Sequence, residues 1–133
     1  MDQDRDRLRA LSTRLLRLHG VLLDRERLAY EERHGSVASR ELLHLLLHDE
    51  QFSWLRSLSS MIANIDAIVD ADEILPESVR GAFRAAYRLL KSDEGGDFRD
   101  KYHLALQDSP DVIMAHAAVS RVLSDAGPDP GTR

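Results

Sequence analysis

Cysteine is absent from this 133-residue chain, and lysine is scarce. Without a thiol the chain can form no disulfide, and it has no thiolate to act as a nucleophile or a metal ligand. The 18 basic residues include two lysines, Lys91 and Lys101, and both lie close to an acidic segment. A lysine in such a place is not desolvated enough to become a nucleophile, so amine chemistry is not expected.

Long apolar runs and the common catalytic motifs are also missing. No segment approaches the roughly 20 apolar residues that a membrane-spanning helix needs. The charged start, MDQDRDRLRAL, is unlike the apolar stretch of a signal peptide. The chain has no glycine-rich phosphate loop, no dinucleotide fingerprint, no His-Glu-x-x-His and no Gly-x-Ser-x-Gly. We therefore expect a cytoplasmic protein that binds no membrane, and we find no positive sign of an enzyme.

The formal net charge of -5 is unevenly distributed. Residues 1–40 hold nine arginines and seven acids, about +2, and the rest holds nine basic and sixteen acidic residues, about -7. Two parts of opposite sign usually neutralise each other in the fold. A phosphate-binding surface needs a clear excess of positive charge, so we expect no nucleic-acid partner.

Leucines recur at spacings of three and four between residues 4 and 34, which predicts one long amphipathic helix. The members of this stripe are Leu8, Leu11, Leu15, Leu18 and Leu22. Gly20 interrupts the pattern. We interpret it as a small residue at which another helix crosses closely, and a break in the helix is the alternative.

A second long helix is predicted over residues 39–71, because this stretch has neither glycine nor proline and repeats apolar residues at helical spacing. Gly35 stands where the end of the first helix favours glycine. Ser36 or Ser39 is the expected N-cap of the second helix. The two helices should therefore form an antiparallel hairpin.

The hairpin predicts which charges meet. Asp66 and Asp70 stand at the C-terminal end of the second helix, where acidic side chains oppose the helix dipole. Antiparallel pairing brings them level with Arg5. We expect Arg5, Arg7 and Arg9 to supply cations to this end of the bundle.

Three shorter helices are predicted to follow, over 76–92, 98–107 and 110–124. An acidic, glycine-rich loop at 92–97 separates the first two. Proline and a capping serine suit the first turn of the last helix, which begins after Ser109. No run alternates with the period of a strand.

These patterns together predict an all-α fold. We expect a single-domain bundle of four to five helices over residues 1–125, built on the hairpin of about 4–34 and 39–71. Residues 126–133 should form a flexible C-terminal tail.

One part of the second helix is unusually rich in leucine. Between Leu42 and Leu47, apolar residues cover nearly the whole circumference, and a helix that is apolar all round is buried all round. In a chain of this size, either several helices or a second subunit must cover the extra surface. The candidate interface residues are Leu42, Leu45, Leu46 and Phe52.

The same part of the helix carries a candidate metal site. His44 and His48 are four residues apart and Glu41 is three before His44, so all three project from neighbouring turns. Glu41-x-x-His44 also has the spacing used in di-iron bundles, for which Asp100-x-x-His103 is the nearest second copy. Such a site would hold zinc or iron.

Two further histidines and two aromatic residues can be explained by packing in the core. His19 and His116 lie in apolar stripes, where a buried histidine with a satisfied hydrogen bond is expected. Tyr30 and Trp54 could line a small-ligand pocket between helices, but our preferred interpretation of Trp54 is a plain core residue.

Our leading hypothesis is a non-catalytic helical bundle without a cofactor. It would act through self-association, as a homodimer, or through a protein partner. The alternative is a zinc- or iron-binding bundle centred on Glu41, His44 and His48.

Overall fold

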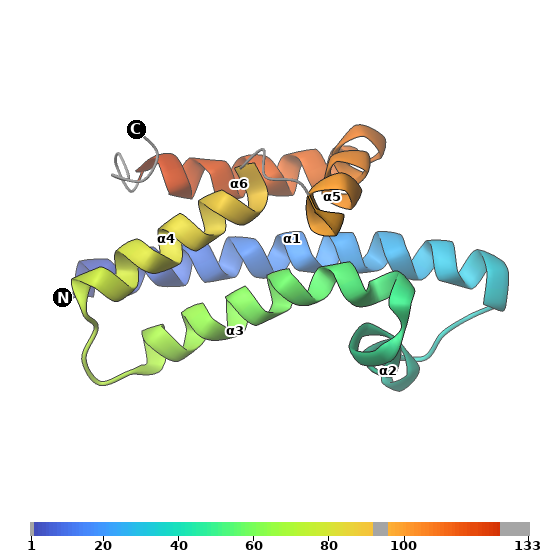
Figure 1. The fold of residues 1–133 in the computed structure, drawn as a ribbon, viewed down its shortest axis with the longest axis horizontal. Coiled ribbons are helices and arrows are strands. Elements are labelled where there is room, and N and C mark those ends of the chain that lie inside the picture. The colour runs from blue at the N-terminus through green and yellow to red at the C-terminus, as the bar shows by residue number, and fades with distance from the viewer. Residues whose placement is uncertain (1, 92–95, 126–133) are drawn as a thin grey trace.

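Six α-helices and one 310 helix make up the computed structural model, which describes residues 2–91 and 96–125 (Figure 1). No strand occurs among these residues, so the predicted all-α fold is confirmed. The elements are α1 (Asp2–His34), α2 (Ser39–His48), η1 (Glu50–Leu55), α3 (Arg56–Asp70), α4 (Pro76–Lys91), α5 (Asp97–Asp108) and α6 (Pro110–Asp125). The predicted tail and most of the predicted loop at 92–97 lie outside the described residues.

Helix α1 is the axis around which the bundle is built. It packs against α3, α4, α6 and η1. Helices α3 and α6 run antiparallel to it on opposite sides, and α5 crosses near the start of α6 (Figure 1). The five leucines of the predicted stripe have no exposed surface, so that prediction is confirmed.

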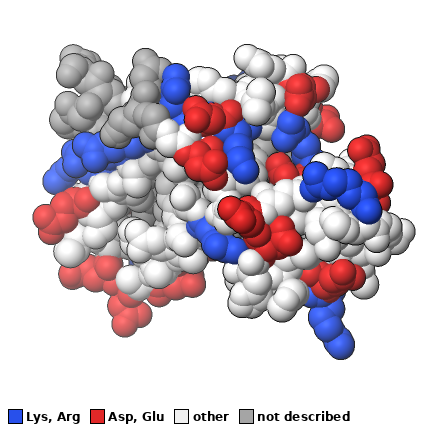
Figure 2. All heavy atoms as spheres, turned by 45° about the vertical axis from the view of Figure 1, so that its right-hand side comes forward, with Lys and Arg blue, Asp and Glu red and all other residues white. Residues whose placement is uncertain are grey.

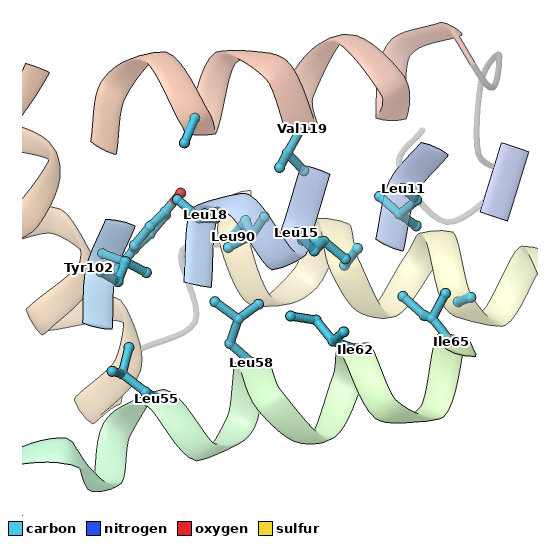
Figure 3. Packing of buried hydrophobic residues seen from close by; sticks show 14 of the residues in the cluster. Leu11, Leu15, Leu18, Leu55, Leu58, Ile62, Ile65, Leu90, Tyr102 and Val119 are labelled. Carbon is cyan, nitrogen blue, oxygen red and sulfur yellow. The ribbon is translucent and has the colours of Figure 1, made fainter. Parts of the chain in front are cut away.

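The core lies along this leucine stripe. Leu58, Ile62 and Ile65 of α3 point toward it from one side (Figure 3). Val119 of α6 points toward it from the other side, and Leu90 joins the same cluster from α4 (Figure 3). One contiguous apolar cluster therefore joins α1 to α3, α4 and α6.

Helix α1 is continuous through Gly20, which is exposed. No described atom lies within 4 Å of the position that a Cβ would take there, so our interpretation of a close helix crossing is wrong. Gly35 does end the helix, because its φ of 86° is left-handed and its N–H donates to the carbonyl of Glu31 at 2.8 Å.

The predicted serine caps of the second arm are wrong. Ala38 is the N-cap of α2, and it offers no side-chain hydrogen bond. The carboxylate of Glu31 instead accepts a hydrogen bond from the N–H of Val37 at 2.8 Å. A side chain of α1 therefore fixes the connection that a serine was expected to fix.

The predicted continuous helix over 39–71 is also wrong, because the chain breaks at Asp49. Asp49 has an extended backbone, with φ -84° and ψ 139°, and its side chain accepts a hydrogen bond from the N–H of Gln51 at 2.8 Å. Asp49 therefore acts as an internal N-cap. The arm consists of α2, η1 and α3 instead of one helix.

Burial of Phe52 gives the physical reason for this break. In a continuous α-helix Phe52 would point about 100° away from the stripe that Leu55 and Leu58 continue. A 310 helix has about three residues per turn and so stacks residues three apart on one side. Phe52 and Leu55 are both completely buried in η1.

The far end of α3 meets the start of α1. The guanidinium of Arg5 donates hydrogen bonds to the backbone carbonyls of Val69 and Ala71. Ser12 donates to the carboxylate of Asp66. Arg5 thus places a cation at the negative end of the α3 dipole, through carbonyls and not through carboxylates.

The other two arginines expected at this end pair within their own helix. Arg7 forms an ion pair with Asp4 at 3.3 Å, and Arg9 forms one with Asp6 at 3.8 Å. Arg7 also lies over the ring of Phe83, 5.1 Å from its centroid. The contact of Arg7 with Phe83 joins the start of α1 to α4.

We predict that Gly20→Ala raises the free energy of unfolding by about 0.5–1 kcal/mol, because alanine costs less backbone entropy in a helix and meets no neighbour here. Urea unfolding measures the change. Gly35→Ala is the control and should lower stability by about 1 kcal/mol, because its φ is left-handed. A destabilised Gly20→Ala variant would contradict a continuous α1.

Candidate functional site

Helix α2 stands apart from the rest of the bundle. Among the described elements it packs extensively against η1 alone. Figure 1 shows it below α1 and α3, on the side away from α5 and α6. An apolar helix in this position has more apolar surface than its own chain covers.

The two sides of α2 differ in burial. Leu45 is 7% exposed and faces the chain, whereas Leu43 and Leu47 are 57% and 55% exposed. Leu43 and Leu47 are one helical turn apart and therefore lie on one face. We call Leu43 and Leu47 the outer leucines. They make the apolar surface that α2 turns to solvent.

Three of the four predicted interface residues lie on the inner side of α2, and Phe52 lies in η1. Leu45 and Phe52 are buried within the chain, and Leu42 and Leu46 are half-buried. The predicted interface residues do not include the outer leucines, and an interface on this segment stays a prediction. Leu47 is in phase with Trp54 seven residues later, so in a continuous helix it would face inward.

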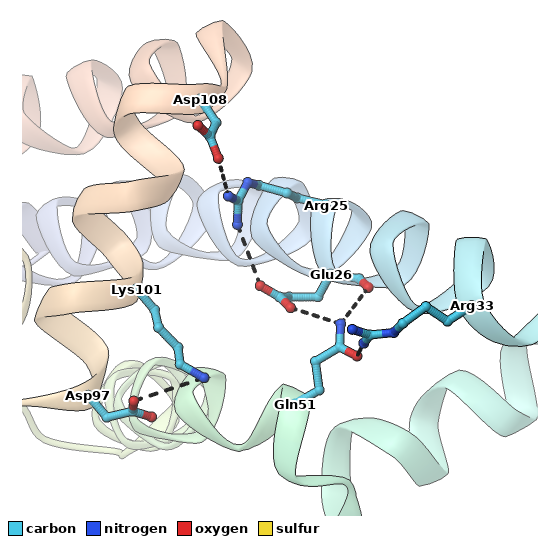
Figure 4. A network of polar contacts seen from close by, with 7 residues as sticks. All are labelled: Arg25, Glu26, Arg33, Gln51, Asp97, Lys101 and Asp108. Atoms are coloured by element: carbon cyan, nitrogen blue, oxygen red, sulfur yellow. Dashed lines mark hydrogen bonds and ion pairs between the residues drawn. The ribbon is translucent and has the colours of Figure 1, made fainter.

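Gln51 ties η1 to α1 and so holds α2 in place. Its amide Nε2 donates to the backbone carbonyl and to the carboxylate of Glu26, both at 3.0 Å, and its Oε1 accepts from Arg33 (Figure 4). Arg25 lies between Glu26, at 3.5 Å, and Asp108 at the end of α5 (Figure 4). This network joins α1, η1 and α5 beside α2.

His44 and His48 both lie exposed on α2, with their ring centroids 4.7 Å apart. Glu41 is exposed one turn earlier. Within the part of the chain that the structure describes, no three histidine, aspartate or glutamate side chains come together closely enough to hold a metal ion. The structure thus brings the two histidines together but not a three-residue site with Glu41, and it places Asp100 and His103 on α5.

His19 is buried and His116 is half-buried, and each has the hydrogen-bond partner that was expected. Ser59 Oγ lies 2.7 Å from Nε2 of His19, and the hydroxyl of Tyr102 lies 2.6 Å from Nδ1 of His116. Burial lowers the pKa of His19 and raises that of Tyr102. Burial also lowers the pKa of His116, and the charges of Lys91 and His103 lower it further.

Trp54 and Tyr30 both take part in packing. Trp54 is 3% exposed and its ring centroid lies 5.4 Å from that of Phe98 on α5. Its indole N–H is buried and has no hydrogen-bond acceptor among the described residues. Tyr30 is half-buried between His34 and Phe52, with ring centroids 4.3 and 6.0 Å away. A small-ligand pocket at these residues stays a prediction.

Charged side chains of both signs occur on the face in Figure 2. On the face in Figure 2, lysine and arginine side chains stand beside aspartate and glutamate over much of the surface, and acidic side chains gather at the lower left. The acidic residues around the α3–α4 connection are exposed, among them Asp70, Asp72, Glu73 and Glu77. Basic and acidic side chains lie beside each other, which fits the expectation that the two parts of the chain neutralise each other's charge in the fold.

No helix in the described ranges is long and apolar enough to cross a membrane. Comparison with protein families, with curated proteins and with solved structures finds no match to this chain.

We predict that the free energy of unfolding falls as the pH drops below about 6.5, the pKa of an unfolded histidine. His19 and His116 have lowered pKa values in the fold, so below that pH the unfolded chain binds more protons than the folded one. Urea unfolding at several pH values measures the slope.

The double variant His19→Gln/His116→Gln should flatten this slope, and His34→Gln, at an exposed position, controls for loss of an imidazole. Equal slopes in the wild type and the double variant would contradict the assignment of this pH dependence to His19 and His116.

Proposed function

We propose that this chain is a non-catalytic helical bundle that acts by self-association through the outer face of α2. The outer leucines carry the proposal, because they expose more than half of their surface on a helix that its own chain encloses on one side. Exposed apolar surface that is contiguous marks interaction sites in soluble proteins.

A second copy is the occupant that this face suits best. A two-fold contact uses the same surface on both subunits, so the outer leucines of one copy meet those of the other. Arg40 and Glu50 are exposed near opposite ends of α2 and supply opposite charges at its rim. An unrelated protein partner is the competing outcome of the test below.

The energy of such a contact is modest. Burying the remaining surface of a half-exposed leucine contributes roughly 1 kcal/mol, so four leucines contribute roughly 4 kcal/mol. Association costs an estimated 4–15 kcal/mol in lost freedom. The leucines alone therefore offset at best the low end of this cost. A dimer with a dissociation constant of about 1 mM needs a net free energy of about -4 kcal/mol, which the rim charges and the rest of the contact must supply.

We predict that the wild type self-associates reversibly as its concentration is raised, and that Leu43→Glu/Leu47→Glu abolishes the association. Charges placed against each other across the contact oppose it. Sedimentation equilibrium over a range reaching about 1 mM measures the mass.

Leu16→Glu is the matched control, because Leu16 is 59% exposed on α1. It should associate like the wild type, and circular dichroism should show that all three proteins keep their helices. A wild type that stays monomeric at the highest concentration would rule out self-association and leave a different protein as the partner.

A further inference from the structure

His44 and His48 are spaced as two ligands of one zinc ion. They lie four residues apart on α2 and their ring centroids are 4.7 Å apart. With Zn–N bonds of about 2.1 Å and tetrahedral angles, the ring centroids of two imidazoles on one ion lie about 5 Å apart. The pair is exposed, so both rings are free to turn toward an ion.

The described residues of one chain leave this pair incomplete as a zinc site. Structural zinc sites have four ligands. The described residues offer no group of three histidine, aspartate or glutamate side chains that could hold an ion. A second molecule can supply the further ligands, and the outer leucines beside the histidines are the surface proposed to bring one.

Symmetry selects how two copies of α2 can share an ion. Leu43 and Leu47 form one stripe on α2, and His44 and His48 form the neighbouring stripe, about 100° further round. A two-fold axis that pairs the helices antiparallel lays each stripe against its own counterpart. Parallel pairing would instead lay histidines against leucines. Antiparallel pairing therefore gathers four imidazoles on one side and four leucines on the other.

Charges at the two ends of α2 fit the antiparallel arrangement. Arg40 lies in the first turn and Glu50 follows the last turn, and both are exposed. Antiparallel pairing brings Arg40 of each copy to the end that carries Glu50 of the other copy. Parallel pairing would instead place like charges together, which opposes association.

We propose that two antiparallel copies of α2 bind one Zn²⁺ through His44 and His48 of each copy, which deepens the proposed self-association and rests on it. Neutral imidazole nitrogens supply the four ligands, and the ion undergoes no redox change. Glu41 of each copy, three residues before His44, provides negative charge near a site that would otherwise carry the full charge of the ion. The ion adds the free energy that the leucines lack.

The test uses full-length protein freed of metal by a chelator. Calorimetric titration with Zn²⁺ should give one ion per two chains, and sedimentation equilibrium should show the dimer forming at lower protein concentration. Zinc at about 100 times its dissociation constant should tighten the dimer roughly 100-fold. His44→Ala/His48→Ala should lose this response and keep the weak association seen without zinc. His103→Ala removes an exposed histidine of α5 and should respond like the wild type.

The outcomes separate this inference from the proposed function. Association that zinc and chelator leave unchanged overturns the zinc site and leaves the leucine contact standing. One zinc per chain with a monomeric mass also overturns it, because the ion would then be held within one copy. Zinc binding that survives the double histidine variant places the ion elsewhere and overturns it as well. A chain that stays monomeric with and without zinc overturns both proposals.

Discussion

The buried leucine stripe of α1 is the constraint on which the rest of the structure depends. Five leucines within four helical turns are completely buried, and each contributes on the order of 2 kcal/mol relative to an exposed leucine. Helices α3, α4 and α6 all pack against α1. The stripe ends at Leu22, although α1 continues to His34. Polar contacts from Gln51 and a ring contact from Phe52 hold the segment beyond it, and α2 lies beside that weakly enclosed end.

The spacing of apolar residues and the residues that favour helix ends were sufficient to predict α1 with its leucine stripe and its end at Gly35. The same patterns were sufficient to predict α4, α5 and α6. The break at Asp49 does not, because Ser39 to Asp72 holds no glycine or proline to mark it. Burial of Phe52 depends on tertiary contacts and outweighs helix continuity. The spacing of three from Phe52 to Leu55 and Leu58, behind an aspartate that can cap, is the signal that could have revealed it.

The same break explains why the spacing of apolar residues predicted the wrong inner and outer faces for α2. In a continuous helix Leu47 would share the inward stripe of α3, and Leu45 would face outward. The extended residue at Asp49 reorients α2, so Leu45 is buried while Leu43 and Leu47 are exposed. The interface and metal hypotheses had been separate alternatives. They meet on one surface once the leucines and histidines are seen as neighbouring stripes of α2.

Hydrogen exchange at low and high protein concentration tests most directly whether a second copy covers the outer face of α2. A contact there slows exchange of amides in the contacted helix in proportion to the fraction of dimer. We expect protection of residues 39–48 to rise with concentration while protection in α5 and α6 stays constant. Exchange in α2 that does not depend on concentration, or protection that rises only in α5 and α6, would contradict the account.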